Sequence, residues 1–404
     1  MNLTKYKKDF PDDVLVTIEE FDKDSGLVIF DFFDSNEATS FLGIVSSSFS
    51  PGQASMVCLR NYWLKPIQEN TIYSLKTQTL ELLQQAINQN TLQNSYLIGL
   101  ELDLSQVRIN GQFFNQAVSP DPNDIFFLPW LSRNPLPIPL DPTHKRLSVT
   151  VRNVGQANWN ELNSDEDVRL VFDVGAPTFA KIGEVRDLLG NRLLRYGKSK
   201  PGLIISHWDK DHYHGLIAMT DEELKCFSFA VFRDELPNLT TRILHGRIRE
   251  ALGKDRIFPI SFINRQGRKG LPQFFPITDL KKNVVLFNSH YHKNRNVSGF
   301  AMIARGVSSS VIFSGDCHFS QISEYLLPHL NYPHQHNLIV PHHGGKAGPF
   351  RYILPFGVRP QNAIISVGVN PYGHPFDDYK TSLSLSKFTV SQTNIKDTDI
   401  NITL

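Results

Sequence analysis

One segment, residues 204–215, constrains the fold and chemistry of this chain more than any other part of the sequence. It reads Ile-Ile-Ser-His-Trp-Asp-Lys-Asp-His-Tyr-His-Gly, so three histidines and two aspartates directly follow an apolar run. A buried strand that delivers Ser206 to the end of a sheet would aim these imidazoles and carboxylates at one point. The segment therefore predicts a metal site at the end of a sheet strand.

Four further polar clusters stand at the ends of short apolar runs. They are Asp173 in Phe-Asp-Val-Gly, Asp316 in Phe-Ser-Gly-Asp, His342 and His343 in Val-Pro-His-His-Gly-Gly, and His374 in Tyr-Gly-His-Pro. Since each cluster follows a run that predicts a strand, we expect these side chains to meet where the strands end. Asp173 is expected to orient a metal-binding histidine rather than to bind metal itself.

Each cluster also has an interpretation that needs no metal. Asp316 could be a turn residue, because Asp and Gly favour turns. His342 and His343 could be loop histidines packed against Pro341, and His374 could belong to a tight Gly-His-Pro turn. A single histidine is more often structural or solvated than a metal ligand. This applies to four further histidines, His214, His290, His292 and His318. The order in which the clusters follow successive runs favours the metal interpretation.

The chain is long enough for two domains, because 404 residues exceed what one hydrophobic core normally holds. Six prolines between residues 119 and 141 disfavour helix and sheet, so we place the domain boundary there, between residues 1–140 and 141–404. The N-terminal part predicts strands at 14–18, 27–33 and 96–104 and a helix at 72–87. The C-terminal part predicts strands at 147–154, 168–174, 203–206, 284–287, 300–304, 311–313, 338–340 and 363–367, and a helix at 178–195.

Composition indicates an ordinary globular protein. Hydrophobic residues make up 41% of the chain and charged residues 20%, and no run approaches eighteen apolar residues. The mixed charges at the start of the chain do not resemble a signal peptide. Cys58, Cys226 and Cys317 are too scattered for a disulfide framework. We therefore expect a cytoplasmic protein that does not enter the membrane.

Charge is unevenly distributed along the chain. Residues 1–50 contain ten acidic and four basic residues, whereas residues 242–295 contain twelve basic and three acidic ones. If the basic residues share one face they would attract a polyanion such as DNA, and otherwise they form a solvated surface. The basic residues are Arg242, Arg247, Arg249, Lys254, Arg256, Arg265, Arg268, Lys269, Lys281, Lys282, Lys293 and Arg295.

The order and spacing of these motifs resemble the metallo-β-lactamase superfamily, in particular the soluble hydrolase domain of ComEC-type DNA-uptake proteins, over residues 147–377. The family pattern Ser-His-x-Asp-x-Asp-His-x-Gly-Gly is matched in its first seven positions, and His214 stands where a Gly is usual. The family's Asp-Val-Gly-Gln-Gly-Asp appears as Asn153-Val-Gly-Gln-Ala-Asn158, without either carboxylate. The channel of ComEC is absent, so the resemblance does not imply DNA transport.

The resemblance implies an α/β fold, a four-layer αββα sandwich of the metallo-β-lactamase type, beside a smaller mixed α+β N-terminal domain. It also implies two divalent metal ions, with Asp316 as the bridging ligand. The expected metal ligands are His207, Asp209, Asp211, His212, Asp316, His374 and His292, with His290 as the alternative to His292. Asp211, His342 and His343 are expected to be catalytic, and either of the last two would be the proton donor to the leaving oxygen.

Position 209 carries Asp where most superfamily members have a second His. A hard oxygen ligand there makes Mn²⁺ a competitor to Zn²⁺, and we expect activity to be highest with Mn²⁺. The function expected from the residues and the resemblance is that of a phosphodiester hydrolase, most plausibly a DNA nuclease, acting through a dinuclear site and a bridging hydroxide. The alternatives are hydrolysis of a small substrate, such as a cyclic nucleotide or a lactone, and a catalytically degenerate effector whose N-terminal domain binds a protein partner.

Overall fold

The computed structural model describes residues 13–22, 26–34, 36–38, 41, 56–60, 72–76, 97–101, 136–137, 146–180, 182–262, 270–330, 334–370, 372–396 and 398–404. The chain divides into two compact units. The N-terminal unit contains Met1–Ser119 with two later segments, Lys181–Gly183 and Glu235–Gly246, and the C-terminal unit contains the rest of the chain. Most of the expected boundary region lies outside the described residues.

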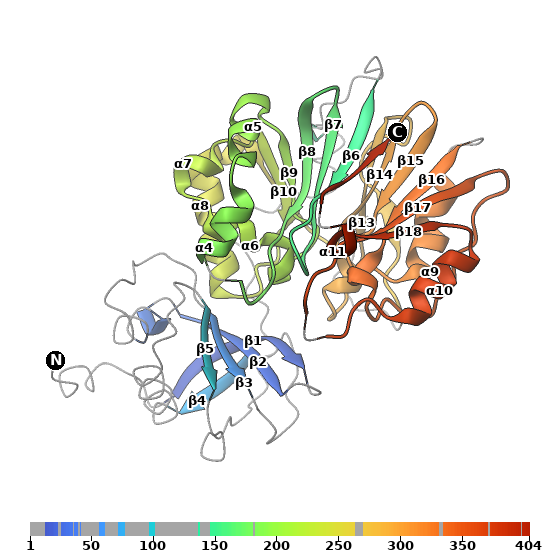
Figure 1. Ribbon diagram of the computed structural model, residues 1–404. Helices are drawn as coiled ribbons and strands as arrows, with labels where there is room; N and C mark the ends of the chain where they lie inside the picture. Colours follow the sequence, from blue (N-terminus) through green and yellow to red (C-terminus); the bar gives the residue numbers. More distant parts are fainter. Residues whose placement is uncertain are drawn as a thin grey trace, which may run out of the picture. The chain divides into compact units, whose positions relative to one another are not determined.

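The N-terminal unit contains a five-stranded sheet with the order β4-β1-β2-β3-β5 (Figure 1). Its strands are β1 Asp13–Asp22, β2 Leu27–Phe32, β3 Met56–Arg60, β4 Ile72–Lys76 and β5 Leu97–Glu101. The strands expected at 14–18 and 27–33 are confirmed, and the one expected at 96–104 is confirmed over Leu97–Glu101. The helix expected at 72–87 is wrong for its first five residues, and the remainder of these two predictions lies outside the described residues. Tyr73 and Leu75 are buried while their neighbours Ile72 and Ser74 are half-buried, so the side chains alternate with the period of a strand.

One charged side chain lies in the interior of this unit. Asp31, on β2, is fully buried, and its Oδ2 accepts a hydrogen bond of 2.7 Å from the backbone N–H of Thr240. Burial raises the pKa of Asp31 to about 7, and Glu19 adds to the rise, although the hydrogen bond from Thr240 opposes it. This carboxyl group is therefore partly protonated at neutral pH.

The C-terminal unit is built on two seven-stranded sheets. The first sheet has the order β11-β10-β9-β8-β7-β6-β19, and the second has the order β12-β13-β14-β15-β16-β17-β18. The first contains β6 Leu147–Val151, β7 Trp159–Ser164, β8 Asp167–Val174, β9 Gly202–Ile204, β10 Phe229–Arg233, β11 Ile257–Ile260 and β19 Ile400–Thr403. The second contains β12 Phe274–Pro276, β13 Val284–Ser289, β14 Ala301–Arg305, β15 Ser309–Phe313, β16 Gln335–Ile339, β17 Arg359–Ile365 and β18 Thr389–Gln392.

Helices cover the outer face of each sheet (Figure 1). On the first sheet, Tyr196 of α5 packs against Trp159 of β7 and accepts a hydrogen bond of 2.8 Å from its indole N–H. On the second, Phe319 of α9 and Leu383 of α10 join the apolar cluster of the strands. The helices are α4 Ile182–Leu189, α5 Arg192–Ser199, α6 Lys210–Ala218, α7 Asp221–Leu224, α8 Leu239–Leu252, α9 Phe319–Gln321, α10 Asp377–Leu385 and α11 Thr393–Lys396. Shorter helical turns are η4 Lys254–Arg256, η5 Asn296–Ser298, η6 Ile322–Leu326, η7 Leu327–His329 and η8 Pro341–Gly344.

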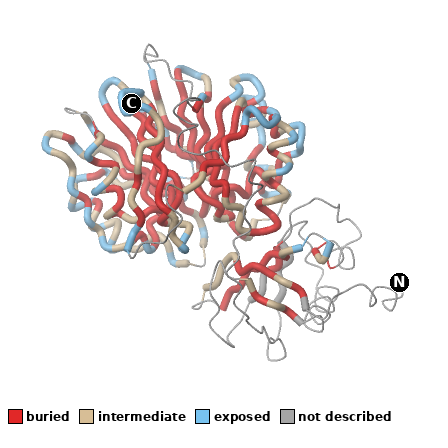
Figure 2. The backbone as a smooth tube through the Cα atoms, turned by 180° about the vertical axis from the view of Figure 1, so that it is seen from behind, coloured by how far each residue is buried: buried red, intermediate tan, exposed pale blue. Residues whose placement is uncertain are grey.

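The main core lies between the two sheets. Phe172 of β8 packs against Phe313 of β15 with 5.5 Å between ring centroids, within a cluster that draws apolar side chains from both sheets. Figure 2 shows that the buried backbone is concentrated in these strands. The expected four-layer αββα sandwich is confirmed. No helix among the described residues is both long and apolar enough to cross a membrane.

The expected strands of the C-terminal unit are all present, but the sequence interpretation missed six others. These are β7, β10, β11, β12, β18 and β19. β7 reads Trp-Asn-Glu-Leu-Asn-Ser and is too polar to resemble a strand, although all six residues are buried. The helix expected at 178–195 is two helices, α4 and α5, which are separated at Gly190, whose φ of +37° lies in the region that favours glycine.

Candidate metal centre

The candidate site residues follow strands that run parallel to one another. β8, β9, β10 and β11 are parallel in the first sheet, and β15, β16, β17 and β18 are parallel in the second. Asp173 ends β8, and Ser206 and His207 follow β9. Asp316 follows β15, and His343 follows β16. Because parallel strands end at the same edge of a sheet, and the sheets face each other, side chains from distant parts of the sequence meet.

Asp173 fixes the orientation of His212. Its Oδ2 accepts a hydrogen bond of 2.9 Å from His212 Nδ1, and its Oδ1 accepts one of 2.7 Å from the backbone N–H of Ser206. The Ser206 hydroxyl donates to the same carboxylate at 2.9 Å. All three residues are completely buried. With Nδ1 engaged, Nε2 of His212 is the nitrogen available to a metal, so Asp173 has the orienting role expected of it.

Asp173 itself has an unusual backbone, with φ at +64°. A non-glycine residue in the left-handed region is strained, and such strain persists only where the surrounding structure enforces it. Two residues further on, Gly175 lies against the start of α6, because a Cβ there would come within 1.8 Å of the Asp211 carbonyl oxygen. This close approach holds Asp211 and His212 against the end of β8.

One group of candidate ligands consists of His207, His212 and Asp316. Their ligand atoms all lie within 4.8 Å of one another, and all three residues are buried. Asp316 Oδ1 lies 3.3 Å from His212 Nε2, and Asp316 Oδ2 lies 4.0 Å from His207 Nε2. Asp316 therefore presents one oxygen to each imidazole, as a carboxylate shared between two ligand sets would.

A second group consists of Asp211, His212 and His343, whose ligand atoms also lie within 4.8 Å of one another. His343 Nε2 lies 2.9 Å from Asp211 Oδ2, and its Nδ1 donates a hydrogen bond of 2.7 Å to the carbonyl of Ser366. The Ser366 carbonyl thus turns Nε2 of His343 toward Asp211. His342 and His343 both have positive φ, at 52° and 54°, which is a second concentration of backbone strain at this centre.

The electrostatics of the two groups suit a cation. Burial alone would raise the pKa of Asp316, but His212, His342 and His207 lower it well below its usual value. Burial likewise opposes the ionisation of Asp211, yet His212 and His343 lower its pKa. The pKa of His212 is raised well above normal, against the effect of burial, by Asp316, Asp173 and Asp211. Buried carboxylates that stay ionised among imidazoles are the donor set of a divalent metal.

The residues fit a metal in one further respect. His207 is only 2% exposed, and its Nε2 makes no hydrogen bond of good geometry, although Asp209 Oδ2 lies 3.3 Å away. Buried polar nitrogens are nearly always paired, so this lone pair is oriented for a group that binds there. His207, His212, Asp211, His343 and Asp316 could together hold divalent metal.

Asp209 has a different environment. Its Oδ2 lies 3.3 Å from His207 Nε2, and its Oδ1 forms an ion pair with Arg295, 2.8 Å from Nε. Burial raises its pKa, but Arg295 and then His207 outweigh that effect and lower it far below its usual value. Asp209 is thus at the centre, but one of its oxygens already has a cationic partner. The sequence interpretation placed Arg295 only in a basic segment.

Besides Asp209, two other expected ligands lie outside both groups. His374 is half-buried, and its Nδ1 lies 3.2 Å from Gln156 Nε2. Burial, together with His342 and His343, lowers its pKa to about 4. His292 Nδ1 accepts a hydrogen bond from the backbone N–H of Asn294 at 3.1 Å. In the described part of the chain, the place expected for His374 beside Asp211 and His212 is taken by His343.

The remaining candidate histidines have packing roles. His214 is completely buried, its Nδ1 donates to the carbonyl of Pro177 at 2.9 Å, and burial lowers its pKa well below normal. His290 stacks on Phe275 with ring centroids 5.0 Å apart. His318 lies against Gly348, since a Cβ there would come within 2.6 Å of its Nδ1.

Asn158 is a functional candidate that the sequence interpretation left aside. Its side-chain Nδ2 donates to Asp316 Oδ1 at 3.3 Å and lies 3.4 Å from His212 Nε2. The residue is 3% exposed, so the amide belongs to the centre. Its position in the loop that resembles Asp-Val-Gly-Gln-Gly-Asp was the available signal. Asn158, which stands where the family pattern has an Asp, therefore supplies a neutral hydrogen-bond donor to the centre in place of a carboxylate.

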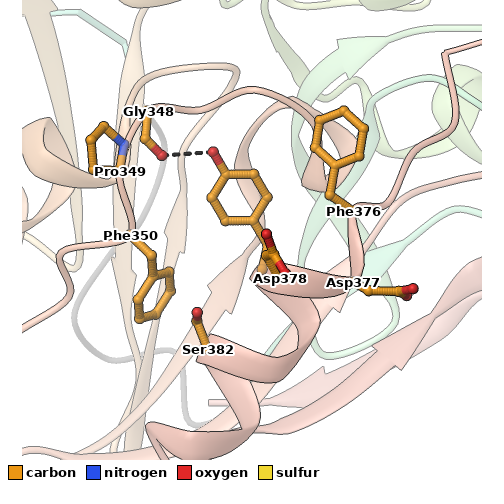
Figure 3. Close-up of a pocket in the computed structure, with 8 residues that line it drawn as sticks. Gly348, Pro349, Phe350, Phe376, Asp377, Asp378 and Ser382 are labelled. Atoms are coloured by element: carbon orange, nitrogen blue, oxygen red, sulfur yellow. Dashed lines mark hydrogen bonds between the residues drawn. The ribbon is translucent and has the colours of Figure 1, made fainter.

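A cavity of about 530 Å³ opens between the loop after η8 and the start of α10 (Figure 3). Three aromatic rings line it, and Tyr379 Oη donates to the Gly348 carbonyl at 2.6 Å. Ring contacts connect the cavity to the histidines after β16. The ring centroids of Phe376 and His374 are 5.2 Å apart, and those of His374 and His342 are 5.5 Å apart. The lining residues are Gly348, Pro349, Phe350, Phe376, Asp377, Asp378, Tyr379 and Ser382.

Comparisons with known proteins give only distant similarities. No family model matches the chain, and no curated protein matches its sequence. The crystal structure of human tRNase Z, short form, is similar with a TM-score of 0.35 and 12% identity over 60% of this chain and 92% of that one. CmlA, a diiron β-hydroxylase from Streptomyces venezuelae, is similar with a TM-score of 0.33 and 12% identity over 65% of this chain and 54% of that one.

Proposed function

We propose that this protein is a metal-dependent phosphodiester hydrolase of the metallo-β-lactamase superfamily, and that its substrate is DNA. The observation that carries the proposal is the convergence of His207, His212 and Asp316 with Asp211 and His343 in two groups that share His212. The motifs that resemble the superfamily in sequence are the same ones that meet in space. A chance set of polar loops would not bring five such residues from three strand ends together.

A divalent metal bound here would lower the pKa of a water molecule and stabilise negative charge on phosphoryl oxygens. The chain supplies the rest of the chemistry. Asp173 and the Ser366 carbonyl fix the rings of His212 and His343, and Asn158 holds Asp316. His342 is half-buried beside the ligands and close enough to Asp316 to lower its pKa. Because His343 belongs to the ligand groups, we assign proton donation to the leaving oxygen to His342.

The proposal that the substrate is DNA is supported by charge and by aromatic surface. Residues 242–295 are strongly basic, and Arg295 lies at the centre. The aromatic rings of the cavity could stack bases next to the scissile phosphate. Replacing Phe376 with Ala is expected to raise KM for single-stranded DNA about tenfold, and to leave KM unchanged for an abasic strand of equal length. An equal loss on both strands would contradict base stacking.

The central test uses the purified full-length protein. Metal content and hydrolysis of linear DNA, circular DNA, RNA and a bis-aryl phosphodiester would be measured for the wild type and for His212→Ala. The proposal expects bound metal and DNA cleavage in the wild type, and loss of both in the variant. Cleavage that persists in His212→Ala would show that another site or a contaminant is responsible.

The donor atoms of the centre restrict which metal ions it should prefer. The carboxylates of Asp211 and Asp316 beside the imidazoles of His212 and His343 suit Mn²⁺ as well as Zn²⁺. We expect the metal-free protein to recover most activity with Mn²⁺. Equal or better recovery with Zn²⁺ would contradict this expectation.

Two other functions remain to be distinguished. A hydrolase of a cyclic nucleotide or a lactone would use the same centre, and a substrate panel separates it from a nuclease. An effector that has lost catalysis would bind a protein partner through the N-terminal unit. The intact ligand groups argue against that alternative, which would be favoured if the purified protein bound metal but hydrolysed nothing.

A further inference from the structure

The two sides of the metal centre differ in what surrounds their carboxylates. On one side, Asp211 faces His212 and His343, and no lysine or arginine is among the groups that shift its pKa most. On the other side, Asp209 faces His207 and forms an ion pair with Arg295 at 2.8 Å. Arg295 is 16% exposed and Asp209 is 25% exposed, so this pair is largely shielded from water. Shielding strengthens the pair relative to a surface salt bridge.

Arg295 is held at the centre by a braced loop. The backbone N–H of Phe300 donates to the Ser206 carbonyl at 2.8 Å, which ties the end of the loop to the strand that delivers His207. Arg233 Nη2 donates to the carbonyls of Ser298 and Gly299 at 2.6 and 2.9 Å. Gln321 Nε2 donates to the Val297 carbonyl at 2.9 Å. The guanidinium is therefore placed by the fold and does not reach the centre by chance.

The His207 side is also poor in ligands. Among the described residues, His207 is grouped only with His212 and Asp316. His212 also belongs to the group of Asp211, and Asp316 Oδ1 lies 3.3 Å from His212 Nε2. His290 and His292 have other partners, namely the Phe275 ring and the Asn294 backbone. A metal ion on this side would have to draw Asp209 away from Arg295.

We propose that Arg295 is a fixed cation of the centre and takes the place of a second tightly bound metal on the Asp209 side. It binds an oxygen of a tetrahedral anion. That anion lies next to the metal ion, whose ligands are Asp211, His212, His343 and Asp316. A guanidinium carries its charge at all working pH values, and its planar fork of N–H donors matches a phosphoryl group. Asp209 then orients Arg295 through its contact with the guanidinium Nε, and it acts on the anion only through Arg295. The phosphoryl part rests on the proposed function.

Two measurements without turnover test this proposal. After dialysis against metal-free buffer, elemental analysis should find one equivalent of metal per chain in the wild type. Titration of the Mn²⁺-loaded protein with inorganic phosphate should give a Kd that is weakened at least about tenfold in Arg295→Ala and less in Arg295→Lys, because the charge is retained but the fork is lost. Arg295→Ala should keep the tight metal and take up a second one at higher Mn²⁺ concentration, because Asp209 is released.

The matched control is Arg169→Ala, which removes a half-buried guanidinium that is paired with Asp167 outside the centre. Its phosphate Kd should stay within about twofold of the wild type. The proposal would be overturned if the wild type held two equivalents of tightly bound metal and Asp209→Asn lost one of them. An unchanged phosphate Kd in a folded Arg295→Lys or Arg295→Ala protein would also overturn it. Failure to hydrolyse any phosphodiester would contradict the proposed function alone.

Discussion

Buried aspartates in the two units have pKa values that are shifted in opposite directions. Asp31 in the N-terminal unit and Asp316 in the C-terminal unit are both almost inaccessible to solvent. Burial raises the pKa of Asp31 to about 7, and the acid Glu19 adds to the rise. Burial acts on Asp316 in the same direction, but three imidazoles reverse it and keep the group ionised. Burial alone yields a neutral acid, and only the surrounding cations make a buried carboxylate a ligand.

The largest difference between the two aspartates should be catalytic. Asp316→Asn keeps the shape of the side chain but removes its negative charge from between His207 and His212. We expect hydrolysis to fall about 10³-fold or more, which exceeds the loss usual for a group that only orients a ligand. Asp31→Asn should leave kcat unchanged. Comparable losses in both variants, measured on the same substrate, would remove the distinction.

The stability of the N-terminal unit should fall as pH rises toward 7. The pKa of Asp31 is about 7 in the folded state and 3.8 as a model value, so the native state holds a proton that the unfolded state has released between these pH values. Stability from this group is fully present below about pH 4 and falls as pH rises to 7, by up to about 4 kcal/mol. Asp31→Asn should abolish that fall. Hydrogen exchange of the β2 amides at pH 5 and pH 7 measures it, and an unchanged pH dependence would contradict the assignment.

Metal should stabilise only the C-terminal unit. At a concentration of Mn²⁺ one hundred times its Kd, a site present only in the folded state adds about 2.7 kcal/mol to stability. Slowed hydrogen exchange should therefore appear in β8, β9, β15 and β16 and not in β1 or β2. Asp316→Asn should eliminate the effect. Protection of the N-terminal strands by Mn²⁺ would point to a second site outside the centre.

The smallest effect is expected for a carboxylate that acts through a histidine. Asp173→Asn removes the charge that orients His212 but leaves every ligand in place, so metal affinity should fall about 10- to 100-fold. Its equilibrium metal titration would be compared with that of Asp167→Asn, a change in a half-buried residue of the same strand that lies outside the centre. A loss as large as that of Asp316→Asn would mean that Asp173 itself binds the metal.

The sequence predicted the features that depend on local order. Apolar runs followed by His and Asp identified the strand ends, and the parallel strands explain why Asp316 and His212 meet. The choice between His343 and His374 could not be predicted, because it depends on how the loop after β16 turns through two residues with positive φ. The role of Arg295 was also inaccessible, since it depends on the contact of Phe300 with Ser206, far away in the chain. The N-terminal strand at 72–76 was missed because Ile72 and Leu75 have the i, i+3 spacing of a helix, whereas the alternation of the strand is carried by Tyr73 and Leu75.

Anomalous diffraction from crystals of the full chain grown with Mn²⁺ tests the account most directly. We predict a strong peak bounded by Asp211, His212, His343 and Asp316, with Arg295 still paired with Asp209. A map with no peak among these side chains, at a Mn²⁺ concentration that supports any activity, would contradict the assignment of a metal centre.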